Sequence, residues 1–368
     1  MMMKRINKLF LLAVCGIFLA AGTTFSQPGM NDIYEKIERV ENNFEYLGHR
    51  LDVLEKQIDD IYWYNKVGDV AFIDKVYMTG PPLAHEPNPT AQGAGNPVKF
   101  WSYIFIPRAA ENGKKYPLLV FPHGGVHSNL STYYTHIIRE LVAQGYIIVA
   151  AEYRGSTGYG ASHYRKIDYG GLETEDVDAS RQYMIDNYSI VDKNRVGILG
   201  WSHGGLITLL NIFDHPENYK VAFAGVPVSD IIARMGYKTQ SYRDLYSADY
   251  HIGKTAYEDV EEYRRRSPAW QAHRYQGTPL LIHTNTNDAD VNVLEVEHLI
   301  KSLKAEGKKN FEYEIFQDIP GGHSFDRMDH MTAKNIRMKI YKHLNNVLKP
   351  ESPFKTVKDL QRAGYVYE

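Results

Sequence analysis

The sequence predicts an α/β fold, a doubly wound and mostly parallel sheet preceded by a long amphipathic helix. Two observations support this prediction. Short apolar runs alternate with helical segments through most of the chain, and apolar residues near the amino terminus follow a heptad pattern. Strands that alternate with helices need right-handed crossovers, so we expect a sheet that is buried on both faces.

The first residues, 1–26, have the pattern of a signal peptide. Lys4, Arg5 and Lys8 precede an apolar run that ends in small and polar residues. The alternative is a retained membrane anchor, but the run is short for a bilayer span and no stop-transfer charges follow it. We therefore expect an exported protein, periplasmic or extracellular, with no stable membrane span after cleavage. The single cysteine, Cys15, lies in this segment, so we expect no cysteine chemistry in the mature protein.

A long helix is expected over residues 27–64. Apolar residues recur there in alternating steps of four and three, which defines a heptad seam. The seam has two possible uses, pairing with copies of itself or packing on its own catalytic domain. We favour a homo-oligomer formed through residues 31–61, because the spacing is so regular. The seam consists of Ile33, Ile37, Val40, Phe44, Leu47, Leu51, Leu54, Ile58 and Ile61.

Composition marks the boundaries of the remaining segments. Pro, Gly, Asn and Ala are frequent between 81 and 97, and periodicity is absent, so we predict a linker over 65–99. A catalytic domain is expected over 100–350 and a tail over 351–368. Within the domain, 230–276 is aromatic, charged and helical in character, which indicates a small cap or insertion above the sheet.

Strands and helices alternate through the predicted domain. The expected strands are 118–121, 146–151, 196–199, 221–226, 280–283 and 311–316. The expected helices are 131–143, 174–187, 205–213, 294–305 and 333–347.

Charge and ligand spacing argue against two classes of partner. The formal net charge is -2 and the charged residues are interspersed, so no basic stripe predicts nucleic-acid binding. His323, Asp326 and His330 are close in sequence, but their spacing matches no strong metal-ligand signature. We expect neither a metal nor another cofactor.

A candidate nucleophile follows the strand at 196–199. The residues Gly200-Trp201-Ser202-His203-Gly204-Gly205 lead from that strand into an apolar helix, which is the context of a nucleophile elbow. The flanking glycines let strand and helix approach closely, and the strained turn lifts the serine hydroxyl above the sheet. We assign Ser202 as the nucleophile of an α/β-hydrolase fold.

The partners of that serine are expected later in the chain, the acid first and the histidine last. The polar loop after the strand at 280–283 contains two candidate acids, Asp288 and Asp290. The loop after the strand at 311–316 contains His323, which is flanked by glycines and is our candidate general base. His330 is its nearest rival, but it lies beside the last helix.

Two backbone groups are candidates for the oxyanion hole. The N–H of His203 follows the nucleophile directly. The loop His123-Gly124-Gly125 after the strand at 118–121 resembles glycine-rich oxyanion loops, so we assign the second donor to Gly125.

Several motifs together resemble the prolyl oligopeptidase family of serine peptidases over residues 101–349. The most specific are the tryptophan before the serine and the run Tyr153 to Gly160. The motifs that resemble the family are His123-Gly124-Gly125, Glu152 to Gly160, Val196 to Gly205, Arg266-Ser267-Pro268, Leu280 to His283 and Gly321 to Phe325.

The resemblance implies a serine hydrolase that cleaves peptide bonds through a triad and an acyl-enzyme, and the signal-peptide pattern implies that it is secreted. The family's acid stands three residues before a valine, and counting back from Val291 selects Asp288 over Asp290. Departures are Thr284 in place of a glycine, Val126 in place of a proline, and a helix and linker where family members usually have a β-propeller. In family members the propeller admits only short peptides to the active site. Without that filter, an esterase acting on acylated carbohydrate is an alternative. A coiled-coil scaffold with an inactive hydrolase domain is another.

Overall fold

The computed structural model describes residues 30–364. The predicted signal peptide and Cys15 lie outside the described residues. The chain divides into two compact units, residues 1–48 and 49–368, and the sheet belongs to the second. No helix in the described range combines the length and the apolar character needed to cross a bilayer.

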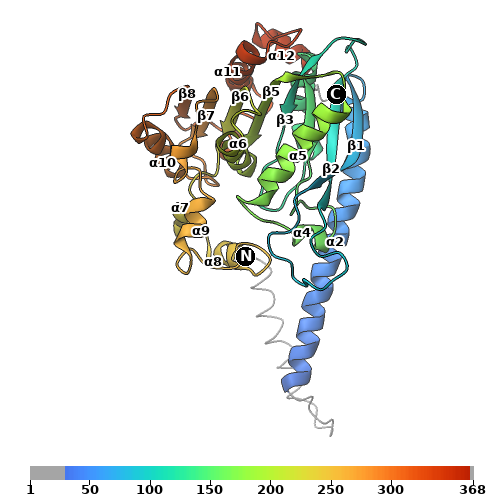
Figure 1. Cartoon of the computed structure of the whole chain (residues 1–368), viewed down its shortest axis with the longest axis vertical. Helices are drawn as coiled ribbons and strands as arrows, with labels where there is room; N and C mark the ends of the chain where they lie inside the picture. Colours follow the sequence, from blue (N-terminus) through green and yellow to red (C-terminus); the bar gives the residue numbers. More distant parts are fainter. Residues whose placement is uncertain (1–29, 365–368) are drawn as a thin grey trace. The chain divides into compact units, whose positions relative to one another are not determined.

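The described part of the second unit contains one eight-stranded sheet (Figure 1). Its strand order is β1-β2-β4-β3-β5-β6-β7-β8; β2 is antiparallel to both of its neighbours, and the strands from β3 to β8 are parallel. This arrangement confirms the predicted α/β class. The strands are β1 (Ala71–Gly80), β2 (Val98–Pro107), β3 (Tyr116–Val120), β4 (Ile147–Ala151), β5 (Val191–Trp201), β6 (Val221–Gly225), β7 (Leu280–Asn285) and β8 (Phe311–Phe316).

The predicted linker over 65–99 needs a correction. The amino-terminal helix α2 continues to Val67, and β1 occupies 71–80, so only a turn at 68–70 and the segment 81–97 lie outside helix and strand. β1 is an edge strand whose residues alternate between exposed and covered positions, with Asp74 exposed and Met78 buried. Such a strand lacks the continuous apolar run that marks a central strand, and its partner β2 follows only after an irregular loop.

Helices cover both faces of the sheet (Figure 1), and the buried apolar residues form two clusters. One cluster includes α5 (Leu172–Asn187), α6 (His203–Asp214) and α10 (Val293–Ala305). The other includes the last turns of α2 (Met30–Val67), together with α3 (Thr135–Ala143), α11 (Met331–Leu348) and α12 (Val357–Ala363). The segment 230–276 contains α7 (Ile231–Tyr237), α8 (Gln240–Ser247) and α9 (Val260–Arg265), and the short α4 (Ala161–Tyr164) follows β4.

A buried ion pair joins two of these helices. Arg337 of α11 donates from Nε and Nη2 to the two carboxylate oxygens of Glu140 in α3, at 2.8 and 2.9 Å. Its Nη1 donates to the carbonyl oxygens of Asp326 and Met328, each at 2.9 Å. Burial raises the pKa of the Glu140 carboxyl, and the adjacent guanidinium opposes that rise. Arg337 thus anchors α3 and the segment that precedes α11.

Removing Arg337 should therefore destabilise the fold strongly. Arg337→Leu leaves Glu140 buried without its counter-charge, and we expect a loss of about 3–5 kcal/mol in the free energy of unfolding. Lys339→Leu on the same helix is the matched control, because Lys339 pairs with Glu314 at the surface, and we expect a change within about 1 kcal/mol. Urea unfolding followed by circular dichroism measures both. Equal losses in the two variants would contradict the role of Arg337 as a buried anchor.

Candidate active site

Ser202 occupies a sharp turn between β5 and α6. Its backbone angles are φ 60° and ψ -120°, a conformation that non-glycine residues rarely adopt. Its N–H donates to the carbonyl oxygen of Gly225 at 2.9 Å. The turn requires its glycines, since a Cβ on Gly200 would stand 2.4 Å from the oxygen of Gly204, and one on Gly204 would stand 2.2 Å from the oxygen of Pro122. The geometry is that of the predicted elbow.

His323 lies in a short 3-10 turn after β8. Gly321 and Gly322 precede it with φ of 108° and 52°, so both adopt left-handed backbone conformations that favour glycine. The imidazole Nδ1 is 2.7 Å from Oδ2 of Asp288, and about a fifth of the side chain (21%) remains exposed. His323 thus combines a carboxylate partner with access to solvent, as a general base requires.

The two candidate acids have different environments. Asp288 is buried, and its Oδ1 accepts from the N–H groups of Asp290 and Val291 at 2.8 and 2.9 Å, which leaves Oδ2 to face His323. The carboxylate of Asp290 is 63% exposed and lies 3.0 Å from Nζ of Lys238. Partial burial alone would raise the pKa of Asp290, but the bond to Lys238 holds it below the ordinary value. The structure therefore brings Asp288, and not Asp290, to the histidine.

The oxyanion candidates flank Ser202. A Cβ on Gly124 would stand 3.4 Å from Cβ of Ser202, so the loop after β3 lies directly against Ser202. Gly125 has φ 89°, and its carbonyl oxygen lies 2.8 Å from Nδ1 of His203. His203 is the first residue of α6, where backbone N–H groups have no partner within the helix. Both predicted donors thus belong to backbone segments that adjoin Ser202.

The imidazoles of His203 and His123 are buried and structural. Nε2 of His203 lies 3.1 Å from Oε1 of the buried Glu173. Nε2 of His123 lies 2.9 Å from the hydroxyl of Ser156, and its ring stacks on Tyr153 with centroids 4.2 Å apart. Burial lowers the pKa of His123 to about 3, so this ring stays neutral. Glu173 was not predicted from the sequence, because a single buried carboxylate leaves no pattern there.

A hydrogen bond joins the end of β5 to the loop that contains His323. The indole Nε1 of Trp201 donates to Oδ2 of Asp326 at 2.7 Å, and both residues are buried. This bond explains the position of Trp201 directly before Ser202, and it gives Asp326 a role other than metal binding. His330 caps α11 by accepting from the N–H of Ala333 at 3.2 Å. Within residues 30–364, no group of three or more His, Cys, Asp or Glu side chains could hold a metal ion.

The insertion supports the acid loop. Nη1 of Arg234, in α7, donates to the carbonyl oxygen of Asp290 at 3.0 Å and to Oε1 of Glu295 at 3.1 Å. The hydroxyl of Tyr237 donates to Glu295 and accepts from the N–H of Asn292 at 3.1 Å. The insertion was predicted from the sequence, but these contacts were not, because they join helices that are distant in sequence.

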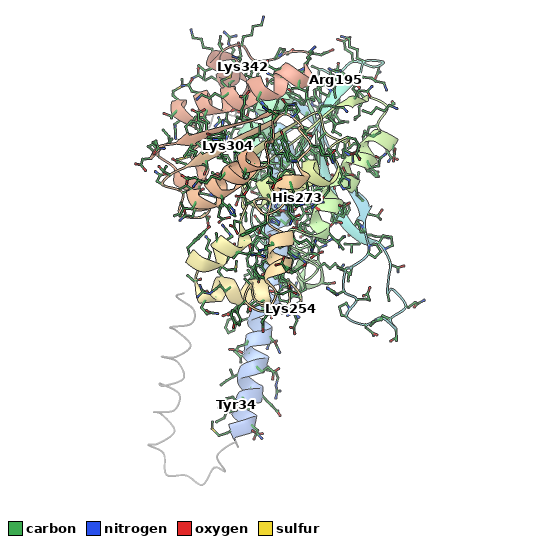
Figure 2. The ribbon with its side chains drawn as sticks, turned by 60° about the vertical axis from the view of Figure 1, so that its left-hand side comes forward. Tyr34, Arg195, Lys254, His273, Lys304 and Lys342 are labelled. Carbon is green, nitrogen blue, oxygen red and sulfur yellow. The ribbon has the colours of Figure 1, made fainter. Side chains whose placement is uncertain are left out.

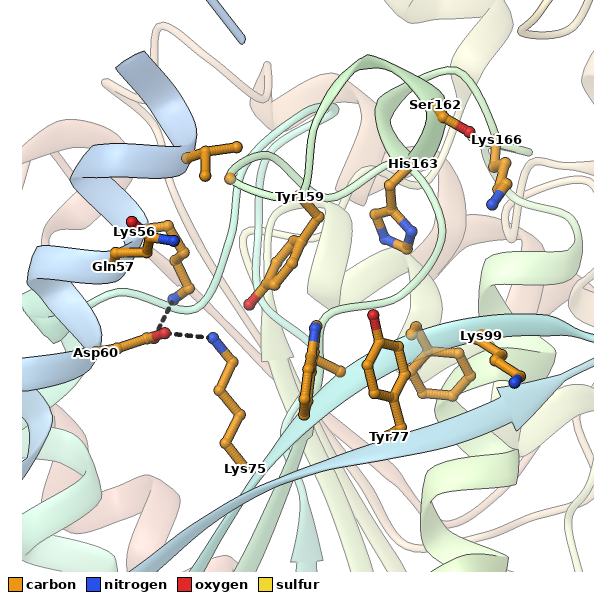
Figure 3. Close-up of a pocket in the computed structure, with 14 residues that line it drawn as sticks. Lys56, Gln57, Asp60, Lys75, Tyr77, Lys99, Tyr159, Ser162, His163 and Lys166 are labelled. Carbon is orange, nitrogen blue, oxygen red and sulfur yellow. Dashed lines mark hydrogen bonds and ion pairs between the residues drawn. The ribbon is translucent and has the colours of Figure 1, made fainter. Parts of the chain in front are cut away.

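A cavity of about 660 Å³ lies elsewhere in the same unit, between α2, the β1–β2 edge and the loop at α4 (Figure 3). Ser202, Asp288 and His323 do not line it. One wall contains the pair between Lys75 and Asp60, whose Nζ and Oδ2 are 2.6 Å apart. Its other prominent lining residues are Lys56, Lys99, Lys166, Tyr77, Trp101 and Tyr159.

The sheet order, the elbow at the end of β5 and the Asp288–His323 pair after β7 and β8 define an α/β-hydrolase fold. The model of the Prolyl oligopeptidase family matches residues 132–351, and the chain belongs to that family. This membership confirms the resemblance and places the chain in a family of serine peptidases.

Individual relatives agree with the family assignment. The "Uncharacterized peptidase YuxL" of Bacillus subtilis is 30% identical over 238 residues, which cover 64% of this chain and 35% of that protein. The "Acylamino-acid-releasing enzyme" of Arabidopsis thaliana is 26% identical over 270 residues, 71% of this chain and 35% of that protein. The chain therefore spans about a third of the length of these two relatives.

Solved structures share the fold. A puromycin-hydrolyzing peptidase of Mycobacterium tuberculosis superposes with a TM-score of 0.59 at 22% identity, covering 76% of this chain and 40% of that one. An acylaminoacyl peptidase in complex with Z-Gly-Gly-Phe-chloromethyl ketone gives a TM-score of 0.59 at 19% identity, covering 78% of this chain and 44% of that one.

Because the two aspartates have different environments, we expect different results when each is replaced by asparagine. Asp288→Asn should slow the labelling of Ser202 by a fluorophosphonate by about 10⁴-fold, because the amide favours the wrong tautomer of His323. Asp290→Asn is the matched control two residues away, and its labelling rate should stay near that of the unmodified protein. Stopped-time labelling followed by mass spectrometry measures both rates. A slow Asp290→Asn with a normal Asp288→Asn would reverse the assignment of the acid.

Proposed function

We propose that the chain is a secreted serine hydrolase that cleaves peptide bonds, with Ser202, His323 and Asp288 as its triad. The observation that carries the proposal is the 2.7 Å contact between Nδ1 of His323 and Oδ2 of Asp288. These residues follow Ser202 in the order acid then histidine, at the carboxyl ends of neighbouring parallel strands. Membership of a serine peptidase family supports the choice of an amide as the bond that is broken.

The mechanism follows from these positions. His323, oriented by Asp288, accepts the proton of the Ser202 hydroxyl through Nε2 while Oγ attacks the substrate carbonyl. The backbone N–H groups of His203 and Gly125 stabilise the oxyanion of the tetrahedral intermediate. The carbon–nitrogen bond breaks as His323 gives its proton to the leaving amine, and an acyl-enzyme forms. Water then attacks the acyl-enzyme, again with His323 as base, and releases the acid.

The names of the relatives support a peptide substrate. They include acylamino-acid-releasing enzymes and the human "Dipeptidyl peptidase 8", which is 28% identical over 221 residues, 56% of this chain and 23% of that protein. Because the chain spans only part of each relative, their substrates do not transfer directly. We propose short or exposed peptides as the substrate, with no metal or other cofactor.

The two alternative functions, an esterase and an inactive scaffold, make different demands on the proposed triad. An esterase would use the triad unchanged, because an ester has a better leaving group than an amide. A scaffold with an inactive hydrolase domain would be expected to lack a triad member, whereas Ser202 retains its strained turn and His323 retains its carboxylate. We further propose export to the periplasm or exterior, on the pattern of residues 1–26, and self-association through residues 31–61.

A panel of substrates tests the bond that is cleaved. Aminoacyl and prolyl amides are compared with acetyl and feruloyl esters, and kcat/KM is measured for each. We expect turnover of at least one amide, at a rate comparable with that of the best ester. Turnover of esters alone would replace the peptidase proposal by the esterase.

Ser202→Ala is the control for that panel. Triad members act as a unit, so we expect kcat to fall by about 10⁴-fold or more on every substrate. Labelling by a fluorophosphonate should disappear in the same variant. Absence of labelling in the unmodified, folded protein would instead favour the inactive scaffold.

A further inference from the structure

From Lys56 onward, one face of α2 packs against the rest of the second unit, residues 49–368, which we call the hydrolase unit. Trp63 and Val67 are fully buried and Lys56 is 2% exposed. Nζ of Lys56 lies 3.1 Å from the buried carboxylate of Glu152, and Asp59 accepts from the hydroxyl of Thr132 at 2.6 Å. These contacts fix the rotation of the helix about its axis from residue 56 onward.

The heptad seam lies on the opposite face and is exposed. If Ile58 is given position a, the buried residues Lys56, Trp63 and Val67 occupy positions f and c, which lie opposite a and d. The seam residues Leu51 and Ile61 are 60% and 63% exposed within the hydrolase unit. Earlier in the same helix, Val40, Phe44 and Leu47 are each more than half exposed, as is Tyr34 (Figure 2). Ile37 is half-buried and the other eight seam residues are exposed. An exposed apolar stripe of this length is typical of an interaction surface.

The charged residues beside the seam identify its partner. Positions g contain Lys36 and Arg50, and positions e contain Glu41 and Glu55. In a parallel coiled coil, each g residue faces the e residue five positions later in the partner, so Lys36 meets Glu41 and Arg50 meets Glu55. In an antiparallel coil, g faces g and e faces e, so every charged pair is between like charges. The pattern is therefore complementary to itself in one orientation only.

We propose that the seam pairs with a second copy of this chain in a parallel, in-register, two-stranded coiled coil. The seam runs over four heptads, from Ile33 to Ile61, which is the length that a stable coiled coil needs. Parallel pairing places both hydrolase units at the carboxyl-terminal end of the coil. The inference deepens the self-association proposed above, and it does not depend on the peptidase activity.

Charge reversal in the full chain tests the orientation. Lys36→Glu with Arg50→Glu makes both e and g acidic, and in a parallel coil the dissociation constant should rise by about 10-fold or more at low salt. Adding Glu41→Lys and Glu55→Lys restores opposite charges and should restore the affinity. An antiparallel coil should respond to neither change, since like charges face each other in all three proteins. Sedimentation equilibrium measures the masses and affinities.

A disulfide tests the register. The background is the full chain with Cys15→Ser, and Val40→Cys places one thiol at a d position away from the middle of the seam. In a parallel, in-register coil this residue faces its own copy, so mild oxidation should give a covalent dimer. Glu38→Cys, at an outward-facing b position, is the control and should remain largely monomeric after oxidation.

Three outcomes would overturn the inference: a monomeric unmodified chain, an acidic variant with unchanged affinity, or equal cross-linking at positions 38 and 40. Fluorophosphonate labelling of Ser202 is also measured on each variant. A protein that dimerises as expected but is not labelled would contradict the peptidase proposal alone. A labelled monomer would contradict this inference alone.

Discussion

The candidate site depends on the turn at Ser202. A left-handed conformation at a serine costs about 1–3 kcal/mol, and it persists only where the surroundings determine it. Here the N–H of Ser202 donates to Gly225, and its carbonyl oxygen accepts from Leu206 and Val228. Neighbouring glycines have no room for a side chain. The turn therefore fixes where β5 ends, where α6 begins and how closely the loop after β3 approaches.

The histidine loop is connected to the same turn by buried polar contacts. Trp201 holds Asp326, and Arg337 holds the carbonyl oxygen of Asp326 while it pairs with Glu140. Each of these groups is buried. Losing one partner of the neutral bonds leaves the other unsatisfied at a cost of about 1–3 kcal/mol, and breaking the charged pair costs about 3–5 kcal/mol. The position of His323 is consequently tied to β5 and α3, which are distant in sequence.

The sequence predicted those features that are encoded locally. The central strands have continuous apolar runs, and the elbow has its glycines, so the sheet and Ser202 were predictable. The edge strand β1 was not, because Asp74 and Lys75 interrupt its apolar residues, which form neither a continuous run nor a strict alternation.

The choice between Asp288 and Asp290 has a different basis. The two residues are nearly adjacent, and only the resemblance to a family selected one of them. In the structure, backbone N–H groups hold one carboxylate toward His323, and Lys238 of the insertion holds the other away. Glu173 and Arg234 were missed for a related reason: their partners come from other segments, and no spacing in the sequence records them.

The exposure of the heptad seam also follows from buried contacts between segments that are distant in sequence. Turning α2 by half a turn would bring the seam residues from Leu51 to Ile61 toward the second unit, but it would withdraw Lys56 from Glu152. A carboxylate left buried without its counter-charge costs about 3–5 kcal/mol, and Trp63 and Val67 would lose their apolar contacts as well. The helix therefore cannot bury its seam against its own domain without losing the contacts that hold it there. A second helix satisfies both faces, since it covers the a and d positions and leaves c and f where they are.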